Sequence, residues 1–359
     1  MRTGVNSITT INAPPESDLR GPYDPDPDRQ DEMWFLPPLE EPDSQFLSPY
    51  PNPEPRLLFD PLRWRAAQAA LSSELASLTF YFGALDERLR SGPRGWRQRL
   101  ALLETADLSW WAGDRIDPER LALWHGMRLS GVLDDSQSLA RAGWAMRRLT
   151  NGPCPDEGGW INGAAAFLGR GQVTAPEHAG DIEDLADVMA TVSDLHRVTQ
   201  AAILFHAWRK VGQGPSCDIE AAVMAARLGA RIGRGGAISL PLALSGSRGL
   251  RGSGSELDRL ASWIEGAERA VLASLLHLDR LADWERRTIA ALSGQQGRTP
   301  LQLVRVFADW PLISAPMAEA QIGASRASIQ RNLDLMEARG LIREITGQGR
   351  YRVWTAALV

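Results

Sequence analysis

The clearest chemical pattern in the sequence lies in SRASIQRNLDLMEARG, Ser325 to Gly340. At about 100° per residue, Ile329, Leu333 and Met336 fall on one face of a helix. The opposite face carries side chains that can donate hydrogen bonds to phosphates and base edges. The segment GLIREITGQGRYRVW follows and predicts a β-hairpin whose turn is rich in glycine and arginine. The candidate contact residues are Arg326, Ser328, Gln330, Arg331, Arg350 and Arg352.

These residue types favour recognition of double-stranded DNA. Arginine can bind guanine through two hydrogen bonds, glutamine can bind adenine in the same way, and Ala327 can contact a thymine methyl group. The N-terminus of a helix also favours a phosphate. Arginines in the hairpin, Arg350 and Arg352, suit the minor groove or the phosphate backbone. The alternative is a docking module of the same fold that binds another protein, for example in a replication or partition system.

The elements that must position these side chains lie in residues 298–359. A helix is expected between Pro300 and Pro311, followed by a short second helix over 315–322. A turn at Gly323 then leads into the contact helix. The expected helix caps are Ser314, Ser325 and Gly340. Helix, helix, turn, helix and hairpin in this order predict a winged helix-turn-helix.

The rest of the chain separates into an arm and a helical body. Residues 1–55 hold twelve of the 23 prolines and eleven acids against three arginines, which predicts a disordered acidic arm. Residues 56–293 show helical periodicity and predict one all-helical domain, so the fold class is mainly α. Helices are expected at 63–90, 97–113, 117–130, 136–149, 181–210 and 218–233, with a helical pair at 255–293. Glycine-rich loops are expected at 150–180 and 233–255.

Charge and composition limit the partners. The chain carries a net charge of −5, so any nucleic acid site must be local. Residues 298–359 hold eight arginines and five acids, a net charge of +3. Cys154 and Cys217 lack metal-ligand spacing, and no apolar run reaches the roughly 18 residues that span a bilayer. We therefore expect a soluble cytoplasmic protein without a membrane partner.

Signatures of metal and cofactor chemistry are weak. His178 and His196 flank acids at Asp181, Asp184 and Asp187, but an acidic first turn of a helix explains these acids equally well. The sequence lacks HExxH, GxxxxGK[ST] and GxSxG, so we expect no cofactor and no metal. Several tryptophans either fill the core or line a pocket for a small-molecule effector, namely Trp110, Trp111, Trp124, Trp144 and Trp160.

Two stretches, ALDERLRSGPRGWRQRLALLETADLSWWAGDRIDPERLALWHGM and PLISAPMAEAQIGASRASIQRNLDLMEARGLIREITGQGRYRVW, carry a resemblance. Together they resemble an uncharacterised family of alphaproteobacterial, often plasmid-borne, helix-turn-helix proteins. With the order between them, the resemblance covers roughly residues 60–358. It implies a helical domain of unknown function followed by a DNA-binding winged helix.

The chain is also distantly similar to Fic proteins, which transfer a nucleotide monophosphate to hydroxyl side chains. The similarity rests on SLPLALSGSRGLRGSGSELDRLASWIEGAERA and on the pattern from Arg343 to Gly347. Fic catalysis needs a histidine base, an acid that holds magnesium, and a glycine/asparagine loop with arginines. The corresponding segment, Phe205 to Ala222, places Gln213 at the histidine position, and an alignment on His206 also lacks the motif. The resemblance therefore implies a degenerate Fic-like domain. The alternative hypothesis is a Fic-like nucleotidyltransferase, which would catalyse AMPylation, or an inactive Fic-like interaction protein.

The sequence thus predicts a DNA-binding protein, with a transcriptional regulator as the leading hypothesis. Because operators are usually two-fold symmetric, a homodimer is expected. The helical body would then supply dimerisation or the sensing of a small-molecule effector.

Overall fold

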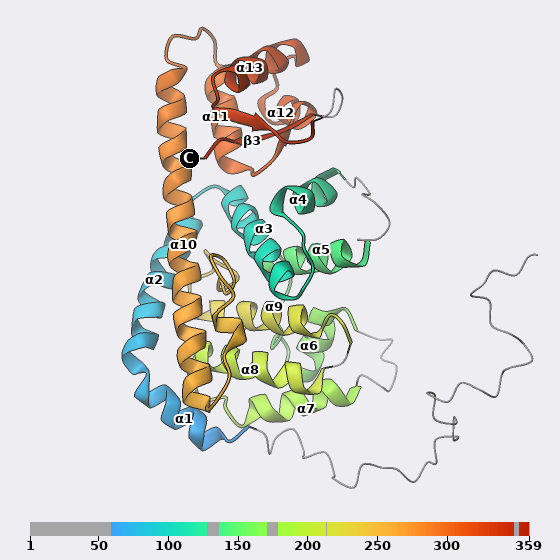
Figure 1. Ribbon diagram of the computed structural model, residues 1–359, viewed down its shortest axis with the longest axis vertical. Helices are drawn as coiled ribbons and strands as arrows, with labels where there is room; N and C mark the ends of the chain where they lie inside the picture. The colour runs from blue at the N-terminus through green and yellow to red at the C-terminus, as the bar shows by residue number, and fades with distance from the viewer. Residues whose placement is uncertain (1–58, 128–135, 171–178, 213, 348–351, 359) are drawn as a thin grey trace, which may run out of the picture. The chain divides into compact units, whose positions relative to one another are not determined.

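Helices make up most of the computed structural model, which describes residues 59–127, 136–170, 179–212, 214–347 and 352–358 (Figure 1). These residues belong to one unit of the chain, Pro53–Val359. The predicted mainly α fold is confirmed, whereas the predicted arm at 1–55 lies outside the described residues. The α-helices are α1 (Pro61–Ala70), α2 (Ser72–Ser91), α3 (Arg94–Trp111), α4 (Pro118–Met127), α5 (Ser136–Thr150), α6 (Trp160–Leu168), α7 (Ala179–Ala190), α8 (Arg197–Val211), α9 (Cys217–Gly229), α10 (Glu256–Ala291), α11 (Thr299–Asp309), α12 (Ala315–Ile322) and α13 (Arg326–Ala338). The strands are β1 (Ile313–Ser314), β2 (Ile342–Glu344) and β3 (Val353–Ala356).

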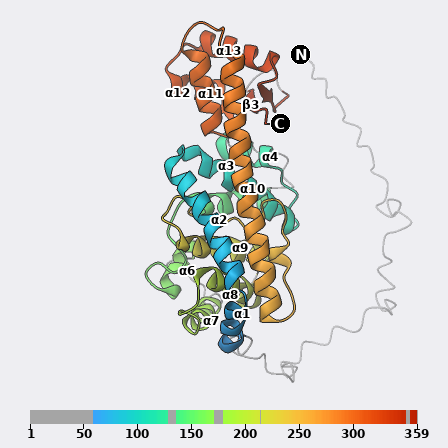
Figure 2. The same ribbon diagram turned by 90° about the vertical axis from the view of Figure 1, so that its left-hand side faces the viewer.

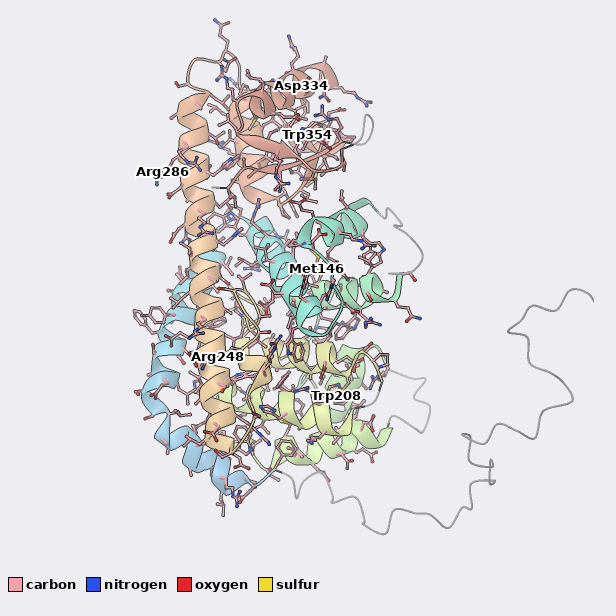
Figure 3. All side chains as sticks on the ribbon, in the orientation of Figure 1. Met146, Trp208, Arg248, Arg286, Asp334 and Trp354 are labelled. Carbon is pink, nitrogen blue, oxygen red and sulfur yellow. The ribbon has the colours of Figure 1, made fainter. Side chains whose placement is uncertain are left out.

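Helix α8 forms the centre of the helical body. Its side chains are buried from Val198 to Trp208, on every face of the helix. A helix that is apolar all round must be covered on all sides, and α7, α9 and α10 pack against it. Figure 3 shows Trp208 among these helices, and its side chain has no exposed surface. The core of the body therefore forms around α8.

Helix α10 links the body to the C-terminal elements (Figures 1 and 2). It runs without interruption over 36 residues, which corresponds to about 54 Å. Ser255 and Asp258 form a capping box at its start. The prediction of a helical pair at 255–293 is therefore wrong, because a single unbroken helix spans nearly all of these residues.

The structure also corrects three helix boundaries. The helix expected at 63–90 is broken at Leu71, while Gly83 lies inside α2. The span 181–210 holds two helices, α7 and α8, because residues 191–196 form turns before α8 begins. The loop expected at 150–180 contains α6, in which three consecutive alanines favour helix and Phe167 is buried. Because glycines flank this short helix on both sides, the sequence predicts a loop there.

The glycine-rich loop expected at 233–255 packs against the body. The buried carboxylate of Glu104 accepts hydrogen bonds from three successive backbone N–H groups, at Leu242, Ala243 and Leu244, at 2.7–2.9 Å. Gly236 lies so close to α2 that a Cβ there would be 1.7 Å from the carbonyl oxygen of Asp86. Here glycine permits a close approach of two backbone segments.

Candidate nucleic-acid interface

Three helices and a small sheet form the C-terminal elements, in the order α11, β1, α12, α13, β2, β3. The Ser314 hydroxyl accepts a hydrogen bond from Met317 N at 3.3 Å and begins α12. The Ser325 hydroxyl accepts one from Ser328 N at 3.4 Å and begins α13. Gly340 follows α13 with a φ of 66°. The predicted caps at Ser314, Ser325 and Gly340 are confirmed. They determine where α12 begins and where α13 begins and ends.

One face of α13 is fully buried. Ile329, Leu333 and Met336 have no exposed surface and belong to a second hydrophobic core. This core also contains Phe307 of α11 and Trp354 of β3. The predicted apolar face of the helix is confirmed, and the opposite face must point away from this core.

The opposite face of α13 is open in the described structure. The Arg326 side chain is 80% exposed, and its Nε lies 3.9 Å from Glu319 Oε1. Ala327 and Arg331 are also exposed, and Arg331 Nε contacts the carbonyl oxygen of Ala327 at 3.4 Å. Among the described residues no carboxylate lies within 4.0 Å of Arg331. Two guanidinium groups on this face are therefore available to an anionic partner.

The other two candidates on α13 are partly engaged within the domain. Ser328 Oγ lies 3.4 Å from Thr299 Oγ1, at the start of α11. Gln330 Nε2 donates a hydrogen bond to Asp334 Oδ1 at 2.8 Å. Asp334 is exposed on the same face, where Figure 3 labels it. Its carboxylate opposes an approaching phosphate, so the face is basic at its N-terminal end and less so further along.

The hairpin after α13 belongs to a three-stranded antiparallel sheet in the order β1-β3-β2. Glu344 pairs with Trp354 in the register of β2 and β3. The Glu344 carboxylate accepts hydrogen bonds from Thr346 N and Gly347 N, which tighten the entry to the turn. Gly347 has a φ of 60°, as expected for a glycine in the turn. Arg350 and the rest of the turn, residues 348–351, lie outside the described residues.

Arg352 is bound to side chains of its own domain. Its Nη2 donates to both carboxylate oxygens of Glu337 at 2.9 and 2.7 Å. The guanidinium carbon lies 4.8 Å from the centroid of the Trp354 ring. The Trp354 Nε1 donates to the same Glu337 at 2.9 Å. Arg352 therefore connects β3 to the end of α13, and no local pattern in the sequence indicates Glu337 as its partner.

The Fic-like candidates lie in the body, far along the chain from this interface. His206 is 8% exposed on α8, and burial first, then Arg259 and Arg209, lowers its pKa to about 3. Its ring stacks edge-on against Phe205 at 5.1 Å. Gln213 lies outside the described residues. His206 is therefore a buried side chain that is neutral near pH 7.

The remaining candidates occupy ordinary structural positions. His196 Nδ1 accepts a hydrogen bond from Val198 N and caps α8, while His178 lies outside the described residues. Within the described ranges no group of three or more His, Cys, Asp or Glu side chains is placed to hold a metal ion. Trp111 packs on Phe205 and Trp144 on Phe167, and both side chains are half-buried against the outside of the core.

Comparison with known families defines the class of the C-terminal elements. Residues 301–356 match the family of HTH DNA-binding domains. This match spans α11 to β3 and includes the buried and open faces of α13. The chain thus carries a helix-turn-helix DNA-binding domain at its C-terminus. No curated protein matches the chain. In the parts of the chain that the structure describes, no helix has the length and hydropathy needed to cross a bilayer.

Proposed function

We propose that this protein is a transcriptional regulator that binds double-stranded DNA through a C-terminal winged helix-turn-helix. The observation that carries the proposal is the geometry of α13, whose inner face is fully buried and whose outer face exposes Arg326 and Arg331. Helix-turn-helix proteins place the N-terminal residues of their recognition helix against base edges in the major groove. Helix α13 has the position of that helix in the fold.

The four candidate side chains of α13 have separate roles in the proposed complex. Arg331 can reach a guanine edge, and Arg326 in the first turn can bind a phosphate. Gln330 can form two hydrogen bonds with adenine once its hydrogen bond to Asp334 is broken. Ser328 and the N-terminus of α13 add donors for a second phosphate. The wing is formed by β2, β3 and the residues between them, including Arg350, and it binds the flanking backbone.

The helical body has a supporting role in this proposal. A homodimer would place two copies of α13 on the half-sites of a two-fold symmetric operator. The body would supply the dimer contact or sense an effector, because it joins the DNA-binding domain through one continuous helix, α10.

Alanine substitution of Arg331 is expected to weaken binding to the specific operator by about 5- to 150-fold, which corresponds to 1–3 kcal/mol for a guanine contact. Arg326→Ala should weaken binding to all sequences and lower the slope of log Kd against log salt by about one. Fluorescence anisotropy with fragments selected from the genomic DNA around the gene measures both effects.

Arg286→Ala is the matched control for these two variants. Arg286 is 76% exposed on α10, and its ion pair with Asp283 is at the surface (Figure 3). The charge change is the same, but the residue lies outside α13. If all three variants lose the same affinity, general charge explains binding and α13 is not the reading element.

Arg352→Ala is expected to act on stability more than on DNA contact. The change removes a two-point bond to Glu337 and the stacking on Trp354, for a loss of about 1–3 kcal/mol in the free energy of unfolding. Chemical denaturation measures this loss. At a temperature where the variant is folded, the salt dependence of its DNA affinity should equal that of the wild type. A reduced salt slope in the folded variant would instead identify Arg352 as a phosphate contact.

A further inference from the structure

A cavity of about 580 Å³ lies between the helical body and the DNA-binding domain. Its volume is within the range of about 300–1,000 Å³ that is typical of small-molecule sites. The body contributes side chains from α3, α4 and α10, and the DNA-binding domain contributes Pro311, Leu312, Arg343 of β2 and the residues from Thr355 to Leu358. Any occupant would therefore touch both parts.

Arg99 of α3 is the most unusual residue of this cavity. It is 4% exposed, and its Nη2 donates to the carbonyl oxygens of Phe307 and Trp310 at 2.8 and 2.7 Å. Its Nε is buried and has no hydrogen-bond partner. Among the described residues no carboxylate lies within 4.0 Å of its nitrogens. Burial lowers its pKa to about 10, so the group stays charged at neutral pH. The charge of Asp309 acts on Arg99 from beyond ion-pair distance and offsets only part of the effect of burial. A buried cation without a direct ion pair is costly, and a bound anion would relieve that cost.

His277 of α10 is a second polar residue in the cavity, half-buried and with a buried Nε2. Its Nε2 has no hydrogen-bond partner. Burial first, then Arg99 and Arg280, lowers its pKa to about 4, so the ring is neutral near pH 7. A neutral imidazole offers one N–H donor and one acceptor nitrogen. It can therefore hydrogen-bond a polar ligand without adding charge.

The acids of the cavity are already engaged. Asp117 Oδ1 accepts a hydrogen bond from Arg120 N as the cap of α4. Glu119 is paired with Arg343 across the two parts, and the side chains are 40% and 59% exposed. Exposed ion pairs of this kind contribute little to the free energy of folding. Among the described residues that line the cavity, Arg99 is therefore the buried cation without a direct ion pair.

We propose that this cavity binds a small amphipathic carboxylate, whose carboxylate faces Arg99 and whose hydrocarbon part packs on apolar walls. These walls are formed by Leu102, Leu103, Leu312 and Leu358. A bound molecule would join α3 and α10 to the segments that flank β1 and β3, and so stabilise one placement of α13 relative to the body. This regulatory consequence rests on the proposed DNA-binding function, whereas the binding of the carboxylate does not.

Isothermal titration calorimetry on the full chain without DNA tests the site. Octanoate and phenylacetate are the probes, and octanamide and phenylacetamide are their neutral counterparts. The carboxylates should bind about tenfold or more tightly than the amides, because a hydrogen bond to a charged group is stronger than one to a neutral group. Ala357→Trp fills the cavity and should abolish binding. Arg99→Met should remove the preference for the carboxylate.

Arg94→Met is the matched control, because Arg94 begins α3 and is exposed outside the cavity. It should bind octanoate as the wild type does. The inference is overturned if neither carboxylate binds at millimolar concentration, if the amides bind equally well, or if Ala357→Trp binds octanoate unchanged. Ala357→Trp keeps the test decisive should Arg99→Met not fold. Because the titration contains no DNA, a failure of the proposed DNA binding leaves its outcome unaffected.

Discussion

Replacing Trp284 by alanine is expected to lower the free energy of unfolding of the DNA-binding domain by about 3–5 kcal/mol. Trp284 lies on α10, is 1% exposed, and belongs to the same core as the buried face of α13. Its ring packs on Phe307 with centroids 6.4 Å apart. Its Nε1 donates to the carbonyl oxygen of Leu341 at 2.7 Å, just before β2. The substitution leaves a cavity and removes one of the two hydrogen bonds to that carbonyl, which also accepts from Ala357 N at 3.1 Å.

Hydrogen exchange followed residue by residue, together with urea denaturation, distinguishes this local effect from general destabilisation. Amides of α11 and α13 should lose protection, while those of α8 keep theirs. Trp110→Ala is the control, because that side chain is 55% exposed on α3. Equal protection of α13 in the Trp284 variant and the wild type would show that α10 does not support the domain.

Replacing Glu104 by alanine is expected to cost at least about 3 kcal/mol, because three buried N–H groups would each lose their acceptor. Glutamine should cost less. It keeps the oxygen that serves Leu242 and Ala243, but its amide group would oppose the N–H of Leu244. Thermal and chemical denaturation of both variants measure these losses.

Glu104 also predicts a pH dependence of stability. Burial raises the pKa of its carboxyl from the usual 4.5 to about 7, although three N–H donors lower it in part and Asp107 raises it further. The folded chain then holds one more proton than the unfolded chain between these two values. Stability contributed by this group is present below pH 4.5 and is lost as the pH rises through about 7.

Denaturation at several pH values between 4 and 8 tests the effect of this titration. In Glu104→Gln the decrease should be absent, because the amide does not titrate. Glu183→Gln, an exposed change on α7, should keep the decrease of the wild type. An identical pH profile in Glu104→Gln and the wild type would show that the carboxyl is already ionised at pH 4.5.

Local signals in the sequence predicted the helix caps and the buried face of α13. Ser314, Ser325 and Gly340 act within three or four residues of their own position, so their role can be deduced without the fold. The three apolar positions of α13 follow from helical periodicity alone. The exposure of Arg326 and Arg331 agrees with the same periodicity, and their contact with DNA stays a prediction.

Features that depend on distant partners could not be predicted. Arg352 pairs with Glu337 only because β3 returns beside the end of α13. The loop at 233–255 resembles a surface segment in composition, yet Glu104, more than 130 residues earlier in the chain, binds its backbone. The role of Arg99 likewise depends on the end of α11, more than 200 residues later. Hydrophobic periodicity does not report such pairs.

Because α10 is continuous, a change in its length would move the DNA-binding domain relative to the body. The body core includes Leu278 of this helix, and the core of the DNA-binding domain includes Leu281, so only two residues separate the last side chain of one core from the first of the other. Inserting a single residue there would rotate the DNA-binding domain by about 100° about the axis of α10 and shift it by about 1.5 Å along that axis. The bonds from Gly95, Trp96 and Arg99 to the end of α11 could not survive that screw motion. The rotation of α13 about the axis of α10, relative to the body, is therefore set by the number of residues in α10.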